Sequence, residues 1–190
     1  MRIKLLDYVT VKQLSLMFDL KGRSNKYRVI KQLEPYLHRF KYGNVTVYAL
    51  NRNGREMVWS DKKRECMENF DHYMMRNDLY IASGCPVTWR NETTFTSRSE
   101  LGMGTVSLRP DAYYMDDGYH LIEIDNKQDM REKRKKVERY RKLIERGTFS
   151  GMPKLKWVTR SSYREKELYD LCDGLNVTVH LWSEIDTANQ

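Results

Sequence analysis

Three carboxylates and a lysine are spaced over two adjoining apolar segments in a way that suits phosphodiester chemistry. Asp111 begins the first segment, while Glu123 and Asp125 end the second and are followed by Lys127. Carboxylate oxygens are ligands that Mg²⁺ and Mn²⁺ prefer. A bound divalent cation polarises a phosphoryl oxygen, and a nearby ammonium stabilises developing negative charge. Asp111, Glu123 and Asp125 are therefore candidate metal ligands, and all four residues are candidate catalytic groups.

A β-hairpin must bring these groups together. The Asp-Asp-Gly turn signal at 116–118 separates two expected strands, 111–115 and 119–125. In an antiparallel pair the start of the first strand lies beside the end of the second, so the first acid is expected next to the later two. Side chains alternate between the faces of a strand, so Glu123 and Asp125 share one face. The following lysine shares that face too, if the strand continues that far.

The alternative is an exposed hairpin end that carries solvated charges. Against it, Glu123 and Asp125 interrupt a Leu-Ile-x-Ile segment that is typical of a buried strand. Acids in such a strand need a partner or a metal ion. The pattern therefore favours a shared acidic site.

The composition is that of a soluble globular protein with one or two domains. The 190 residues are 40% hydrophobic and 32% charged. No segment approaches the roughly 20 apolar residues needed to cross a membrane, and the first residues lack the features of a signal peptide. Three widely spaced cysteines predict neither a disulfide framework nor a zinc site. We therefore expect a cytoplasmic protein with reduced thiols and no membrane partner.

The positive charge is concentrated in the first third of the chain. Residues 1–60 hold 12 Lys and Arg against 4 Asp and Glu, whereas residues 61–190 hold 22 of each kind. The whole net charge of +8 therefore belongs to the first segment. Such a segment is an electrostatic footprint for phosphate backbones. A generally basic surface without a nucleic-acid partner is the alternative.

The basic segment has the element order of a winged helix-turn-helix. Thr10 is a suitable N-cap for a helix over 11–18, and a glycine stop is followed by a second helical pattern over 25–36. Residues 40–50 then change to strand character around a Gly-Asn turn, which predicts a hairpin. In such a module the second helix enters the major groove and the hairpin lies along the DNA backbone.

The polar side chains of the second helix and of the hairpin are candidate DNA contacts. They are Arg23, Asn25, Lys26, Arg28 and Lys31 on the helix, and Lys41 and Asn44 on the hairpin. The alternative is that they form only the solvated face of an amphipathic helix. The charge concentration in this segment favours DNA contact.

The remainder of the chain has the order α-β-β-β-α-β-α-β. The expected elements are a helix over 61–82, a strand over 87–95, a polar loop over 96–104, the hairpin strands, a helix over 129–146, a strand over 154–159, a helix over 163–172 and a strand over 176–182. Residues 131–146 hold nine bases and three acids, which makes this helix a second candidate DNA-facing surface. Lys136 is its candidate phosphate contact, and Tyr140 is most simply a core residue.

This order resembles the PD-(D/E)xK nuclease superfamily, with Pro110-Asp111 opening the second strand and Asp125-Asn126-Lys127 closing the third. Lys136 and Tyr140 resemble a Lys-x-x-x-Tyr pair found in some branches. The whole chain is more narrowly similar to the replication-relaxation family of plasmid and mobile-element proteins. The matching segments are Val11-Lys12-Gln13-Leu14, Arg28-Val29-Ile30-Lys31-Gln32-Leu33-Glu34, Asn53-Gly54-Arg55-Glu56, Arg109-Pro110-Asp111, Glu123-Ile124-Asp125 and Lys136-x-x-x-Tyr140.

The resemblance implies an α/β (α+β) protein with a winged-helix DNA-binding domain at 1–60 and a restriction-endonuclease-like domain at 61–190. The implied function is DNA binding in the replication, transfer or relaxation of a plasmid or mobile element. DNA is the implied partner, with other replication or transfer proteins beside it. One alternative is an endonuclease that uses Mg²⁺ or Mn²⁺. The other is a winged-helix transcription regulator whose second domain mediates dimerisation, so a homodimer stays open.

Overall fold

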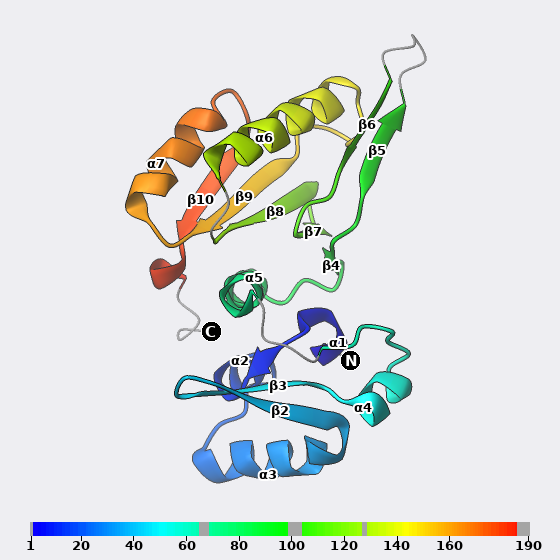
Figure 1. Cartoon of the computed structure of the whole chain (residues 1–190), viewed down its shortest axis with the longest axis vertical. Coiled ribbons are helices and arrows are strands. Elements are labelled where there is room, and N and C mark those ends of the chain that lie inside the picture. The colour runs from blue at the N-terminus through cyan, green and yellow to red at the C-terminus, as the bar shows by residue number, and fades with distance from the viewer. Residues whose placement is uncertain (1, 65–68, 99–103, 127–128, 186–190) are drawn as a thin grey trace. The chain divides into compact units, whose positions relative to one another are not determined.

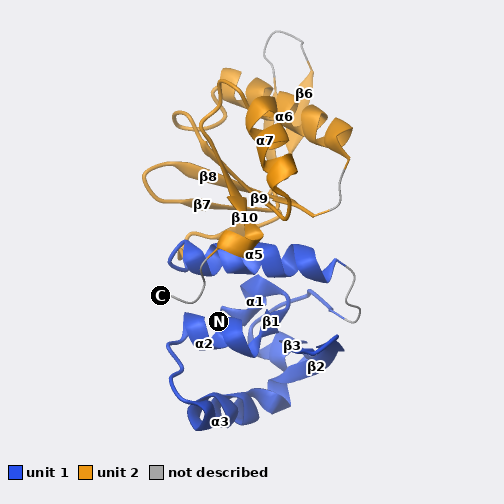
Figure 2. Cartoon of the chain, turned by 90° about the vertical axis from the view of Figure 1, so that its left-hand side faces the viewer, with its two compact units in different colours: residues 1–85, 186–190 blue, residues 86–185 orange. Residues whose placement is uncertain are grey.

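The computed structural model describes residues 2–64, 69–98, 104–126 and 129–185. The chain divides into two compact units (Figure 2). Unit 1 comprises residues 1–85 and 186–190, and unit 2 comprises residues 86–185. Helices and strands occur in both units, so the fold is α+β as predicted. The division falls between Cys85 and Pro86 rather than near residue 60.

Unit 1 is built on a three-stranded antiparallel sheet with the strand order β1-β3-β2 (Figure 1). Its elements are α1 (Ile3–Leu6), β1 (Val9–Thr10), α2 (Val11–Met17), α3 (Arg23–Leu33), the 3-10 turn η1 (Glu34–Tyr36), β2 (Leu37–Tyr42), β3 (Val45–Leu50), α4 (Arg52–Met57) and α5 (Phe70–Ala82). The predicted sequence of two helices and a hairpin is present as α2, α3, β2 and β3. The short elements α1, β1 and α4 were not predicted.

Local side-chain contacts explain where two helices of unit 1, α2 and α4, begin. Thr10 caps α2 in a reciprocal capping box, in which Gln13 N–H donates to Thr10 Oγ1 and Thr10 N–H donates to Gln13 Oε1. Asn51 caps α4 by accepting from Gly54 N–H at 2.9 Å. Gly54 also permits a close backbone approach, because a Cβ there would lie 2.2 Å from the carbonyl oxygen of Tyr36.

The helix expected over 61–82 begins only at Phe70 and belongs to unit 1. Its Asn77 side chain donates to the carbonyl oxygens of Leu6 at 3.1 Å and Tyr8 at 2.6 Å, and all three residues are buried. These long-range hydrogen bonds satisfy backbone groups of the first turn of the chain. They explain why α5 folds with the N-terminal elements.

Unit 2 is built on a five-stranded mixed sheet with the order β10-β9-β8-β7-β4. Its elements are β4 (Arg90–Asn91), β5 (Phe95–Arg98), β6 (Thr105–Leu108), β7 (Ala112–Met115), β8 (Tyr119–Asp125), α6 (Met130–Glu145), β9 (Lys154–Thr159), α7 (Ser162–Leu171), β10 (Val177–Leu181) and the 3-10 turn η2 (Trp182–Glu184). β7 and β8 are antiparallel, and β8, β9 and β10 are parallel. The hairpin, the basic helix and the elements that follow it confirm the predictions to within two residues.

The first strand of unit 2 differs from the prediction. The expected strand over 87–95 is divided, because Glu92 has a left-handed backbone with φ 53°. β4 therefore ends at Asn91, and β5 begins at Phe95 and pairs with β6 in a separate two-stranded sheet. Part of the expected polar loop over 96–104 is thus strand.

The core of unit 2 lies between the sheet and helices α6 and α7. It is formed by Leu121, Leu155, Trp157 and Val179 from the strands, and by Val137, Tyr140, Leu143, Leu168 and Cys172 from the two helices. The apolar positions of α6 repeat at the helical spacing, so most of its basic residues lie outside the buried stripe, to which Lys133 belongs. This packing fixes the height of α6 above β8.

Candidate functional site

Asp111 lies beside the end of β8, as the hairpin predicts. β7 and β8 pair with Ala112 opposite Ile122, which places Asp111 opposite Glu123. Asp111 N–H donates to the carbonyl oxygen of Ile122 at 3.0 Å, and Asp111 Oδ2 accepts from Ile124 N–H at 2.7 Å. The first two acids of the expected site are therefore neighbours across one strand pair.

Glu123 is fully enclosed by partners from α6. Glu123 is only 1% exposed, and its two carboxylate oxygens accept hydrogen bonds from Tyr140 OH and from Lys136 Nζ. Lys136 and Tyr140 are four residues apart, so one face of the helix presents both donors. Tyr140 is a core residue as expected, with its hydroxyl used as a donor to the acid.

Burial raises the pKa of Glu123 to about 8, because the lowering effect of Lys136 does not offset desolvation and the neighbouring charge of Asp111 opposes ionisation. Burial alone would lower the pKa of Lys136, but attraction to Glu123 and Asp111 raises it on balance. The pKa of Glu123 therefore lies well above that of an ordinary carboxyl group. A carboxyl group that titrates near the working pH is suited to proton transfer.

Asp125 has a different environment on the same face of β8. It is 2% exposed, and its carboxylate contacts Lys133 Nζ at 2.9 Å, Arg164 Nε at 2.6 Å and Thr159 Oγ1 at 2.9 Å. Burial alone would raise the pKa of Asp125, but Arg164, Lys133 and the hydroxyl of Thr159 outweigh it and lower the pKa. Asp125 is thus an ionised, hydrogen-bonded partner of two cations.

The sequence did not point to Lys133, Thr159 or Arg164 as members of this cluster. Lys133 lies four residues before the buried Val137 on α6, which is a signal that its side chain turns inward. Arg164 follows Asp125 by 39 residues, and no local pattern links the two.

The arrangement departs from the predicted convergence of three acids on one metal ion. Within the part of the chain that the structure describes, the group of three His, Cys, Asp or Glu side chains with all ligand atoms within 4.8 Å is Asp116, Asp117 and His120 at the hairpin turn. Asp111, Glu123 and Asp125 do not meet this criterion. Helices α6 and α7 place cationic partners against the last two acids instead. Lys127 lies outside the described residues.

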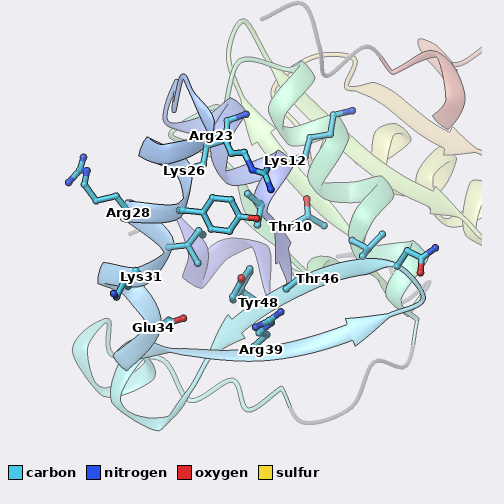
Figure 3. A pocket seen from close by; sticks show the side chains of 15 residues that line it. Thr10, Lys12, Arg23, Lys26, Arg28, Lys31, Glu34, Arg39, Thr46 and Tyr48 are labelled. Atoms are coloured by element: carbon cyan, nitrogen blue, oxygen red, sulfur yellow. The ribbon is translucent and has the colours of Figure 1, made fainter.

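A second candidate site is a groove of about 800 Å³ in unit 1, between α3 and the β2–β3 hairpin (Figure 3). The α3 residues that line it are Arg23, Lys26, Tyr27, Arg28, Ile30 and Lys31, and Glu34 lines it from η1. On the hairpin, Arg39 lies opposite Tyr48 in the strand register, so both side chains face the groove. Thr10 and Lys12 line it from the start of α2.

The groove carries a strong excess of positive charge. Six Lys or Arg residues line it, and Glu34 is its one acid. Within the described ranges, Lys12, Lys26, Lys31 and Arg39 form no ion pair. Uncompensated cations that converge on a concave surface focus a positive potential there. The arrangement can therefore bind an anion with several charges.

The predicted DNA contacts are distributed as follows. Arg23, Lys26, Arg28, Lys31 and Asn44 line the groove. Asn25 accepts from Arg28 at 2.8 Å, and Lys41 is exposed on the hairpin outside the lining. Lys136 lies in unit 2, in its ion pair with Glu123. Lys12 and Arg39 also line the groove and were not predicted.

The units thus define an α+β protein with a cationic groove in one unit and buried acids on a mixed sheet in the other. The chain matches the replication-relaxation family model over residues 3–156 and belongs to this family. Membership indicates a role in plasmid or mobile-element replication or relaxation, and is consistent with interaction with DNA or replication proteins.

Comparisons with curated proteins and with solved structures identify no further relative. The search of curated proteins found no match. Among solved structures, the chain is similar to a crystal structure of protein VC1899 from Vibrio cholerae, with 14% identity and a TM-score of 0.39 over 97% of this chain and 50% of that one. The chain thus spans about half the length of that protein. Within the described residues, every helix is too short or too polar to cross a membrane.

Proposed function

We propose that this protein binds DNA during replication or relaxation of a plasmid or mobile element, through the cationic groove of unit 1. The observation that carries the proposal is the set of cations on α3 and the hairpin that have no acidic partner. In this proposal unit 1 acts as a winged-helix domain, and unit 2 is a nuclease-like domain that supports binding.

Phosphate is the ligand chemistry that fits the groove best. A chain of phosphates offers several negative charges in a row, and each cation that contacts one releases a counterion. The groove presents lysine and arginine side chains from both α3 and the hairpin. A DNA strand that lay between the helix and the wing would need phosphate contacts from both sides. A small monovalent anion would leave most of these charges uncompensated.

The test is the salt dependence of DNA affinity, measured by fluorescence anisotropy with a labelled oligonucleotide. Each lost phosphate contact lowers the slope of log affinity against log salt by about 0.9. The double variant Lys26→Ala/Arg39→Ala should therefore lower the slope by about 1.8. Arg139→Ala/Lys166→Ala removes the same charge from exposed positions of unit 2 and should leave the slope unchanged. Equal slopes in both double variants would refute the proposal.

A second candidate function is metal-dependent cleavage of DNA by unit 2. The observation that favours it is the pairing of Asp111 with Glu123, since repulsion between the two acids contributes to the high pKa of Glu123. A divalent cation would relieve this repulsion, with Asp111 and Glu123 as its ligands in place of Lys136. Mg²⁺ or Mn²⁺ would supply charge stabilisation to a scissile phosphate.

This candidate has two separate readouts. Binding of Mn²⁺ at pH 7 should expel the proton of Glu123, so the heat in titration calorimetry should vary with the ionisation enthalpy of the buffer. Asp111→Asn should abolish that heat. Supercoiled plasmid should be nicked in Mn²⁺ and protected by EDTA. Identical heats for wild type and Asp111→Asn would remove the metal site, and the absence of nicking would leave DNA binding as the function.

A further inference from the structure

The groove of unit 1 has an apolar and aromatic lining that binding of a duplex backbone does not require. Helix α3 has one buried residue, Ile30, and so stands clear of the hairpin over most of its length. Besides the cations, the groove is lined by the apolar and aromatic side chains of Val11, Tyr27, Ile30 and Val45, with Tyr48 from the central strand. A phosphate backbone alone would gain little from such a surface.

The position of the cations on α3 bears on the kind of ligand that the groove accepts. In duplex recognition the outward face of the second helix enters the major groove. Here Arg23, Lys26, Arg28 and Lys31 all line the groove, although Figure 3 shows the Arg28 side chain extended away from its centre. These four are all the cations of α3, and the groove lies between this helix and the protein's own hairpin. Most of the charge is therefore directed into a concave space.

Tyr27 is the side chain best placed to contact a base. It is 64% exposed although it lines the groove, and Arg23 lies over its ring with Cζ 5.7 Å from the ring centre. Exposed tyrosine stacks on unpaired bases of any sequence, and a guanidinium beside it adds attraction for the base and the adjoining phosphate. The pair forms a stacking platform with a built-in phosphate contact.

From these observations we infer that the groove holds unpaired nucleotides of a DNA strand. The base stacks on Tyr27, and the phosphates lie along Lys26, Lys31 and Arg39. The inference rests on the proposed DNA binding and narrows it to single-stranded or locally opened DNA. The groove volume of about 800 Å³ is in the range of sites that enclose a small ligand.

The experiment compares three labelled DNAs of equal length at one salt concentration: a single strand, a duplex, and a duplex with a central single-stranded gap. Wild type should bind the single strand and the gapped duplex more tightly than the intact duplex. Loss of one base–aromatic stack is worth about 1–3 kcal/mol, so Tyr27→Ala should weaken single-strand binding about 5- to 150-fold. Its duplex affinity should change less than about two-fold, because the cations remain.

Two controls separate the explanations. Tyr27→Phe should restore single-strand affinity, because the ring is retained, and Tyr163→Ala should have no effect, because that tyrosine is exposed in unit 2. An oligonucleotide with 2-aminopurine should show fluorescence quenching with wild type and Tyr27→Phe only. Equal weakening of all three DNAs by Tyr27→Ala, or tighter binding of intact duplex by wild type, would overturn the inference while leaving DNA binding intact. Failure to bind any DNA would refute the proposed function itself.

Discussion

Replacing Glu123 with glutamine tests the electrostatics of unit 2 without removing a volume from its core. Glutamine has nearly the same shape, is neutral at every pH and can still accept from Tyr140. Wild-type Glu123 has a pKa of about 8 when folded, compared with an ordinary value of 4.5. Between these values the folded protein binds one proton more than the unfolded chain.

The sign and size of the effect follow from this proton. Stability falls with rising pH wherever the folded state binds more protons, by about 1.4 kcal/mol per pH unit for one proton. The contribution of Glu123 is therefore fully present below its unfolded pKa of 4.5 and lost as pH rises through about 8. Over the whole window the loss is on the order of 5 kcal/mol. Glu123→Gln should remove this dependence, so that the variant is comparable to wild type at pH 5 and more stable above pH 8.

Urea unfolding at half-unit steps from pH 5 to pH 8.5 measures the effect. The signal is tryptophan fluorescence, which reports on unit 2 because Trp89 and Trp157 are buried there, whereas Trp59 is 89% exposed. Glu138→Gln, on the exposed face of α6, controls for the loss of a carboxylate. If the stability difference between wild type and Glu123→Gln stayed constant across this range, the assignment of a raised pKa to Glu123 would be wrong.

Two further predictions concern unit 1. Asp7→Asn should cost about 3–5 kcal/mol at pH 7, because it leaves the buried Arg76 without its carboxylate partner at 2.7 Å. Burial alone would raise the pKa of Asp7, but Arg76 and its basic neighbours lower it on balance, so thermal melts should show the cost shrinking as pH falls through this lowered pKa. Gly54→Ala should destabilise the unit although alanine favours helix by about 1 kcal/mol, because the new Cβ would clash with the carbonyl oxygen of Tyr36. Chemical denaturation measures this loss of stability, with Asn53→Ala as the control. A Gly54→Ala variant more stable than wild type would contradict the clash.

The parts of the fold that local patterns determine were predicted well. The Asp-Asp-Gly turn, the two strands beside it and the helical stripe of α6 each depend on residues close together in the sequence, and the structure has them as expected. The order of motifs that resembled the replication-relaxation family also led to the family that the comparison found. The structure explains why the Asn53-Gly54-Arg55-Glu56 segment has a glycine. Helix α4 packs too closely on η1 for any side chain at that position.

The details that sequence reasoning missed depend on contacts between distant elements. α5 folds with unit 1 because the Asn77 side chain donates hydrogen bonds to backbone carbonyls near the start of the chain. No pattern around residue 77 predicts those acceptors. Asp125 looked like a metal ligand because its own strand offers it no partner. Its partner Arg164 comes from α7, across a parallel connection that local sequence does not reveal. The metal role of Asp125 therefore stays a prediction that must compete with this ion pair.

The contacts of α6 also decide which unit should supply DNA affinity. The nine bases over residues 131–146 suggested a second DNA-facing surface. Lys133 and Lys136 turn inward to buried acids, and Arg141 donates to backbone carbonyls at the end of α7 and just after it. The exposed bases Arg131, Arg134, Lys135, Arg139 and Lys142 share the surface with three exposed acids. In the groove of unit 1, by contrast, six bases face one acid. Because counterion release scales with the cations that reach phosphate, we expect unit 1 to supply the larger share of the proposed DNA affinity.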